Sequence, residues 1–182
     1  MNESLAITTT VTILLALAGY LITYTNNLRL SQRSERLARV NKQLGELYGP
    51  LLATCSATTS AWRKFREKYR PGQGFFDDPP TDEELKAWRL WMSTVFMPNN
   101  LRMYELVVSK ADLLMELEIP ECLLKLCAHV SAYQAIMEKW KSNDFTEHKS
   151  LINFPSELLE YCTESFRMLK SEQARLIGKS AK

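Results

Sequence analysis

Apolar residues follow two different patterns along this chain. From Leu5 to Tyr24, 20 residues occur without one charged side chain. A helix rises about 1.5 Å per residue, so this stretch would be roughly 30 Å long and would match the hydrocarbon core of a bilayer. From Leu28 onward, apolar residues recur every three or four positions, and no alternating run predicts a strand. The pattern predicts an all-α protein, in which an N-terminal transmembrane helix continues into a bundle of about five helices.

The apolar stretch has two interpretations. Tyr20 and Tyr24, near its end, suit the membrane interface. The small residues at 16–18 are typical of a signal-peptide cleavage site. However, the preceding residues carry only Glu3 and no basic side chain, whereas a secretory signal begins with positive charges. The sequence therefore favours a transmembrane anchor over residues 1–27, with a cleaved signal peptide as the alternative.

Charges beside the stretch predict its orientation. Between residues 26 and 42, one acidic residue faces five basic ones, which are Arg29, Arg33, Arg36, Arg39 and Lys42. By the positive-inside rule, we expect a single-pass protein with a translocated N-terminus and a cytoplasmic C-terminal domain. These basic residues are also candidates for contact with anionic lipid, together with basic clusters at 63–70 and 167–182. A dispersed, solvated charge pattern explains all three clusters equally well.

A narrow apolar stripe extends the anchor into a juxtamembrane helix over residues 28–48. It is made by Leu30, Leu37, Val40, Leu44 and Leu47. Fewer than three clean heptads favour packing of this helix on its own domain over a long coiled coil. Gly49 and Pro50 then predict a helix stop or kink, and the helical bundle domain over 49–182 begins there.

Helix breakers divide the bundle domain into its predicted helices. Thr81 and Glu84 form a capping box that starts a helix after the Pro- and Gly-containing linker at 71–80. Pro98 predicts a kink or a fresh start, and Pro120 predicts the first turn of the next helix. A long polar loop then precedes the last helix, which leaves a basic tail.

Composition narrows the class of protein. A 46% apolar and 24% charged composition excludes a disordered tail and a multi-span membrane protein. The net charge of +2 and the lack of a recognition motif indicate no nucleic-acid partner. The four cysteines lie in apolar helical stripes, so we expect reduced core thiols; they are Cys55, Cys122, Cys127 and Cys162.

No motif with a chemical mechanism occurs in the sequence. It has no glycine-rich phosphate loop, nucleophile elbow, Cys-x-x-Cys or His-Glu-x-x-His. His129 and Cys127 point about 200° apart on a helix, so they predict neither a metal site nor a nucleophile and base. We expect His129 to be half-buried and His148 to be solvated. The sequence therefore predicts no catalytic residue, no cofactor and no metal site.

Two groups of carboxylates lack the spacing of a known metal site. One helical face carries three of them, Glu157, Glu160 and Glu164, but lacks the Glu-x-x-His pairs of di-iron bundles and predicts a solvated acidic face. The other group lies within residues 77–84 and lacks the spacing of a calcium loop. We interpret it as a linker followed by a helix cap.

The helix that follows the capping box is apolar on more than one face. One face carries Trp88, Met92 and Phe96, whereas Leu90 and Trp91 point elsewhere. Such a helix is central to its bundle or docks a partner, and a central place is the commoner case. If a protein partner or a second copy of the chain binds, we expect Leu90, Trp91 and Met97 to carry the contact, because large aromatic and Met side chains dominate interfaces.

Three segments carry a resemblance to a known class of proteins. They are Asn41-Lys42-Gln43-Leu44-Gly45-Glu46-Leu47-Tyr48-Gly49-Pro50-Leu51, Trp88-Arg89-Leu90-Trp91-Met92 and Leu126-Cys127-Ala128-His129-Val130. They resemble segments of small single-pass membrane-anchored helical proteins of uncharacterised activity. The resemblance implies that the Leu-Tyr-Gly-Pro turn is a fixed architectural element, and it implies no catalytic residue.

Two functional hypotheses follow. The leading one is a non-enzymatic, membrane-anchored scaffold, adaptor or accessory subunit of a membrane complex, because the chain joins an anchor to a helical body without reactive motifs. The alternative is a membrane-tethered ligand sensor or enzyme with a pocket between helices. That alternative predicts a real cavity with convergent polar groups, lined by Trp88, His129 and Tyr133.

Overall fold

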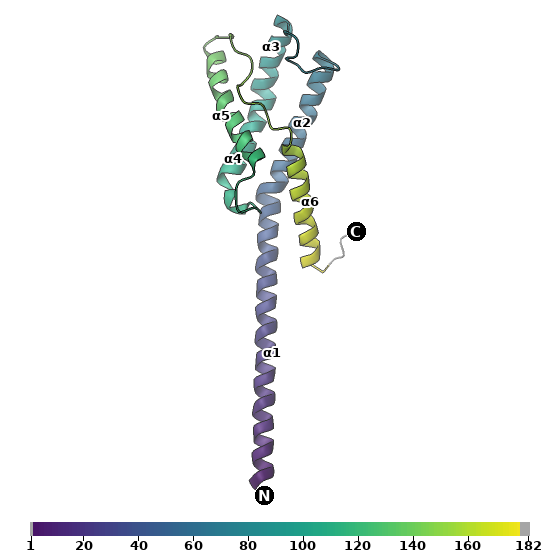
Figure 1. Cartoon of the computed structure of the whole chain (residues 1–182), viewed down its shortest axis with the longest axis vertical. Helices are drawn as coiled ribbons and strands as arrows, with labels where there is room; N and C mark the ends of the chain where they lie inside the picture. Colours follow the sequence, from purple (N-terminus) through teal and green to yellow (C-terminus); the bar gives the residue numbers. More distant parts are fainter. Residues whose placement is uncertain (1, 179–182) are drawn as a thin grey trace.

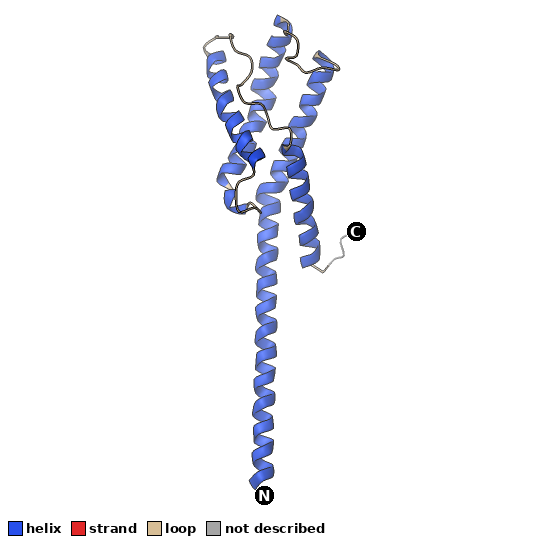
Figure 2. Cartoon of the chain, in the orientation of Figure 1, coloured by secondary structure: helices blue, strands red, loops and turns tan. Residues whose placement is uncertain are grey.

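All regular structure in residues 2–178, the part of the chain that the computed structural model describes, is helical. Side chains are described from Ile7 onward. The elements are α1 (Asn2–Lys42), a π-helical segment (Gln43–Tyr48), α2 (Gly49–Tyr69), α3 (Asp82–Trp91), a second π-helical segment (Met92–Phe96), α4 (Met97–Ser109), a 3-10 turn (Ala111–Leu113), α5 (Glu121–Lys141) and α6 (Leu158–Leu176). The all-α class is confirmed, and Figure 2 shows the helices joined by loops alone.

The molecule is a long rod with a helical body at one end. In Figure 1, α1 extends away from the body towards the N-terminus, and α6 runs back along its body-proximal part. The helix from Ile7 to Tyr69 continues for 63 residues, and its apolar N-terminal part has no buried residue. It is the one helix of the described chain that is long and apolar enough to cross a membrane.

At the two proline sites, the predicted helix stop at Gly49-Pro50 and the predicted fresh start at Pro98 are wrong, whereas the alternative prediction of a kink is not contradicted. Neither Gly49-Pro50 nor Pro98 ends a helix, because a π-helical segment leads directly into each site. As a result α1 and α2 form one continuous rod, and α3 and α4 form another. The helices predicted on the two sides of Pro98 are therefore one helix over 82–109.

The π-helical turns explain how the helices pass their prolines. The N–H of Gly49 bonds to Leu44 O and that of Met97 to Met92 O, in both cases five residues back. This wider turn gives room to the pyrrolidine ring that follows, which would collide with a carbonyl in a regular α-helix. A Cβ atom on Gly49 would lie 2.5 Å from Leu44 O, so glycine is required at this position.

The core begins where α1 enters the body. Leu30 is exposed and Leu37 is partly buried, whereas Val40 and Leu44 are buried. The juxtamembrane stripe therefore packs on its own domain, but only from Leu37 onward. The buried residues of α2, α4, α5 and α6 continue the same core. All four cysteines are free, and Cys127 is the one among them that is not fully buried.

A hydrogen-bond network holds the proline turn of the first rod in place. Tyr48 is fully buried, and its hydroxyl accepts a bond from the N–H of Met115 at 3.1 Å. The hydroxyls of Tyr48 and Tyr161 both donate to Glu116 Oε2, at 3.3 and 3.2 Å. These contacts join the first rod to α6 and to the connection between α4 and α5.

Candidate functional site

A cavity of about 480 Å³ lies between α2, α3, α4, α5 and the loop that follows α5. Small-molecule sites in proteins typically enclose about 300–1,000 Å³ and have mostly apolar walls. The lining includes six aromatic side chains, which are Trp62, Phe76, Trp88, Phe96, Tyr133 and Phe154. We call this cavity the aromatic pocket.

The pocket is where the structure brings together the three lining residues that the sequence suggested. Trp88 comes from α3, whereas His129 and Tyr133 come from α5, one helical turn apart. The His129 and Tyr133 rings lie 5.2 Å apart between centroids. Trp62 of α2 meets Trp88 and Phe96 edge to face, at 5.7 and 5.9 Å. Such contacts fix the positions of the rings before any ligand arrives.

The loop over 142–157 closes one side of the aromatic pocket, and it is held by side chains rather than by regular structure. The backbone carbonyl of His148 accepts hydrogen bonds from Trp88 Nε1 at 2.6 Å and from the Tyr133 hydroxyl at 3.2 Å. Trp140 Nε1 donates to Glu147 O at 2.8 Å. Figure 1 shows this loop crossing from the end of α5 to the start of α6. The side chains that line the pocket therefore also position its cover.

His129 is buried at the pocket wall. Its Nδ1 lies 2.6 Å from Ile152 O, and because a carbonyl only accepts, Nδ1 carries the proton. Its Nε2 is then an acceptor, and it faces Asn100 Nδ2 at 3.4 Å. Burial lowers the pKa of His129, although its bond to Ile152 acts in the opposite direction. Both ring nitrogens are thus engaged within the protein.

Two polar atoms at the pocket have no partner. Asn100 is 2% exposed and Thr58 is 6% exposed, and both line the cavity. Asn100 Oδ1 and Thr58 Oγ1 form no hydrogen bond within the described chain. A buried polar group without a partner costs about 1–3 kcal/mol, so such groups are rare and call for a reason. A ligand that bonds to them would supply one.

Sequence reasoning missed both of these residues. Thr58 lies between Cys55 and Trp62 in the spacing of the buried face of α2, and Asn100 occupies the same kind of position between Phe96 and Met103. The available signal was a polar side chain in phase with an apolar stripe. His148 was also misjudged, because its ring is half-buried and its Nδ1 has no hydrogen-bond partner.

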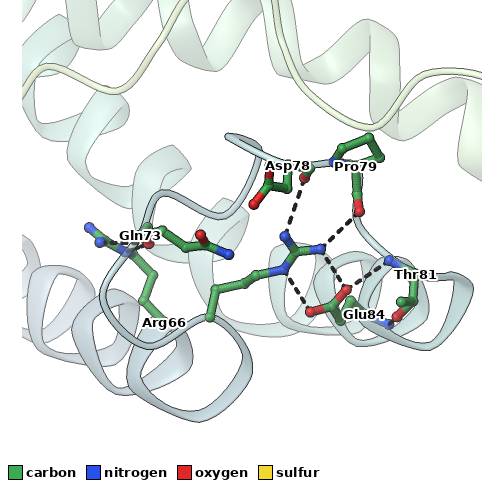
Figure 3. Close-up of polar contacts among 7 residues, drawn as sticks. Arg66, Gln73, Asp78, Pro79, Thr81 and Glu84 are labelled. Carbon is green, nitrogen blue, oxygen red and sulfur yellow. Dashed lines mark hydrogen bonds and ion pairs between the residues drawn. The ribbon is translucent and has the colours of Figure 1, made fainter.

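A second polar cluster surrounds the linker between α2 and α3, and Figure 3 shows its geometry. Arg70 is 8% exposed, and its guanidinium binds both carboxylate oxygens of Glu84, at 2.7 and 2.8 Å. The same guanidinium donates to the carbonyls of Asp78 and Pro79. Glu84 also accepts the N–H of Thr81 and completes the predicted capping box. We call this group the linker clamp.

The linker clamp shifts the acidity of its carboxylate. Hydrogen bonding to Arg70 comes first among the causes that lower the pKa of Glu84 to about 2, and the bond from Thr81 adds to it. The sequence correctly predicted the linker and cap at residues 77–84. It did not predict that Arg70, which resembled the solvated residues of its basic cluster, would be buried as their partner.

The remaining carboxylates give no metal site among the described residues. No group of three or more His, Cys, Asp or Glu side chains there could hold a metal ion. The acidic face of the last helix is exposed, as the sequence predicted, and comprises Glu157, Glu160 and Glu164.

The three residues suggested for a protein partner do not form one surface. Leu90 is 61% exposed, but Met97 is 3% exposed and belongs to the core. Trp91 is half-buried and packs on Phe65, with 5.6 Å between ring centroids. Met97 is buried because the helix continues through Pro98, which keeps it in phase with the core face of α4.

The basic residues next to the apolar stretch are partly engaged within the chain. Arg33 Nε donates to Leu176 O at 2.7 Å, Arg36 pairs with Glu172 at 2.6 Å, and Arg39 donates to Asp112 O at 3.4 Å. Arg29 and Lys42 are exposed. Of the basic tail, Lys179 and Lys182 lie outside the described residues. Contact of this cluster with anionic lipid stays a prediction.

Comparison of the chain with family models, curated proteins and solved structures gives no match. The resemblance to small membrane-anchored helical proteins therefore stays a prediction. The functional interpretation depends on the geometry of the aromatic pocket and of the rod that carries it.

Proposed function

We propose that this chain is a membrane-tethered helical module that binds a small, mostly apolar ligand in the aromatic pocket. The observation that carries the proposal is that two residues lining a cavity of about 480 Å³, Asn100 and Thr58, each hold a buried polar atom without a partner, Oδ1 and Oγ1 respectively. The walls supply apolar contact, and the two atoms supply direction.

Binding is favoured over catalysis by the state of the polar groups. Both nitrogens of His129 are occupied by Ile152 and Asn100, so neither is positioned as a base for a bound molecule. The pocket lining contains no carboxylate and no cysteine. A sensor or carrier role agrees with this arrangement better than an enzyme does. A scaffold or adaptor role stays a prediction, and Leu90, Trp91 and Met97 do not form one contact surface for it.

For the membrane, we propose that the stretch Leu5–Tyr24 spans once with the body on the cytoplasmic side. The exposure of its apolar side chains and the basic residues that follow support this arrangement. Leu117→Cys places a thiol on a fully exposed side chain. We expect a membrane-impermeant maleimide to label it only after permeabilisation of the cells, and labelling in intact cells would overturn the orientation.

Filling the pocket tests the binding proposal. We expect 2-naphthol to bind the full chain in lipid nanodiscs saturably, with a change in Trp fluorescence because Trp62 and Trp88 line the site. Thr58→Phe and Leu159→Trp place a larger side chain in the lining and should reduce the affinity at least tenfold. Ser60→Phe adds the same ring at an exposed position of α2 and should leave binding unchanged.

Two independent pocket-filling variants are used, so that a loss of binding can be distinguished from a loss of folding. Each is first compared with the unmodified chain by its helical circular dichroism and thermal unfolding. Equal saturable binding by the unmodified chain and by folded pocket-filled variants would show that the pocket is not the site. A chain that binds no probe at all would also contradict the proposal.

A further inference from the structure

The polar end of the aromatic pocket is organised by a chain of hydrogen bonds. Ile152 O fixes the proton of His129 on Nδ1, and the bare Nε2 then requires the amide nitrogen of Asn100. The amide of Asn100 can therefore be placed in only one way, with its oxygen directed away from His129. That oxygen is buried and accepts no bond, and Asn100 is one of the residues that line the cavity.

Thr58, on a different helix, is a second residue of the cavity lining that holds a buried polar atom without a partner. Its hydroxyl can donate and accept, whereas Asn100 Oδ1 can only accept. A ligand group that serves both atoms must therefore offer at least one hydrogen to Asn100, and a hydroxyl or an N–H does so. An ether, a ketone or a methyl group would leave Asn100 Oδ1 without a partner.

The charge of the pocket lining limits the charge that a ligand can carry. The one charged residue of the pocket lining is Lys149, whose Nζ lies 5.8 Å from the centroid of the Phe76 ring and whose side chain is exposed. Burial lowers the pKa of His129 and so disfavours its charged form, and the lining contains no carboxylate. A charged ligand group beside Asn100 would lose its hydration and find no opposite charge there.

The walls favour a ring over a flexible chain. Trp62, Trp88 and Phe96 contact one another edge to face and at tilted angles, with centroids 5.7–5.9 Å apart. Fixed flat surfaces of this kind stack best on a rigid planar partner, which also loses little conformational freedom on binding.

We propose that the ligand is a neutral, ring-containing molecule with a hydroxyl or N–H donor at one end, and that it binds with this donor at Asn100 Oδ1 and Thr58 Oγ1. This inference depends on the proposed binding function. It adds the polarity, charge and orientation of the ligand.

Three probes with one ring system test the inference on the full chain in lipid nanodiscs at pH 7. They are 2-naphthol, 2-methylnaphthalene and 2-naphthoate. Binding is corrected for partition into the lipid with the Thr58→Phe chain. We expect 2-naphthol to bind about tenfold or more tightly than either other probe, because only it is neutral and offers a donor.

Variants of Asn100 and Thr58 test whether their side chains cause the tighter binding of 2-naphthol. Asn100→Leu keeps a similar side-chain volume and should bring 2-naphthol and 2-methylnaphthalene to within about twofold of each other. Asn99→Leu, the adjacent residue outside the pocket lining, should keep the preference. Thr58→Val should reduce the preference several-fold, whereas Thr54→Val, one turn earlier on α2 and outside the lining, should not.

The outcomes separate this inference from the proposed function. Absence of binding by all three probes would contradict both. Binding of all three at similar strength would retain the pocket and overturn the ligand class, and it would indicate that water serves the two polar atoms. Tightest binding of 2-naphthoate would also overturn the class, since it would indicate recognition by Lys149 at the exposed side.

Discussion

The linker clamp and the polar end of the aromatic pocket are both buried polar groups, but they are completed in different ways. Arg70 makes four hydrogen bonds, to Glu84 and to the carbonyls of Asp78 and Pro79. Asn100 and Thr58 each leave one buried atom without a partner. The first cluster is closed and serves the fold. The second is incomplete, which is the pattern expected of a site that waits for a ligand.

The largest effect should come from breaking the closed cluster. Arg70→Met leaves Glu84 without its main partner and releases two linker carbonyls, so we expect thermal unfolding to begin several degrees lower. Arg66→Met is the matched control, because Arg66 is only partly buried and its guanidinium donates to Gln73 O rather than to a carboxylate, as Figure 3 shows. It should change the unfolding temperature little.

A double variant sharpens this result. Glu84→Gln keeps a side chain that can accept from the N–H of Thr81, but it removes the negative charge. Arg70→Met with Glu84→Gln should therefore be more stable at pH 7 than Arg70→Met alone. If the double variant is the less stable one, the cost lies in the linker carbonyls rather than in the unpaired carboxylate.

The next effect concerns pH. The pKa of Glu84 is lowered from 4.5 to about 2 in the folded chain, chiefly by Arg70. The clamp therefore contributes its stability fully above about pH 4.5 and loses it as the pH falls towards 2. Urea unfolding at a series of pH values should show this loss, and Glu84→Gln should remove its share of the slope. An unchanged slope in Glu84→Gln would contradict the assignment.

The smallest expected effect is on the stability of the chain when the unpartnered hydroxyl of Thr58 is removed. Thr58→Val removes an unpartnered hydroxyl and should stabilise the unliganded chain by up to about 1 kcal/mol. Thr54→Val on the same helix removes a hydroxyl that donates to Pro50 O at 2.9 Å, and it should destabilise the chain by about 1 kcal/mol. Urea unfolding measures both. Equal losses for the two variants would mean that Thr58 has a partner in solution.

The sequence predicted features that depend on short spacings. The capping box of Thr81 and Glu84, the all-α class and the uncharged stretch from Leu5 to Tyr24 can all be read locally, and the first two are present as predicted. The last has the length, apolarity and exposure of a membrane span.

Other features could not be read from spacing because they depend on three-dimensional partners. Pro50 and Pro98 signal a break in a regular α-helix, but a π-helical turn directly before each proline lets the helix continue. Arg70 looks like its exposed neighbours until the chain turns back and places Glu84 beside it. Asn100 can be identified as a pocket residue only when α5 and α2 have been placed around it.

Under the proposed binding function and membrane arrangement, the continuous helix from the apolar stretch into α2 sets the route by which a ligand would arrive. Thr58 follows Tyr24 by 34 residues in one continuous helix, which corresponds to a height of about 50 Å along the axis. If the stretch spans a bilayer and the rod stands upright, the pocket lies far beyond the headgroups. A lipid cannot enter it by moving sideways out of the leaflet. A ligand of the proposed class would then come through water, and its one polar group would serve solubility as well as recognition.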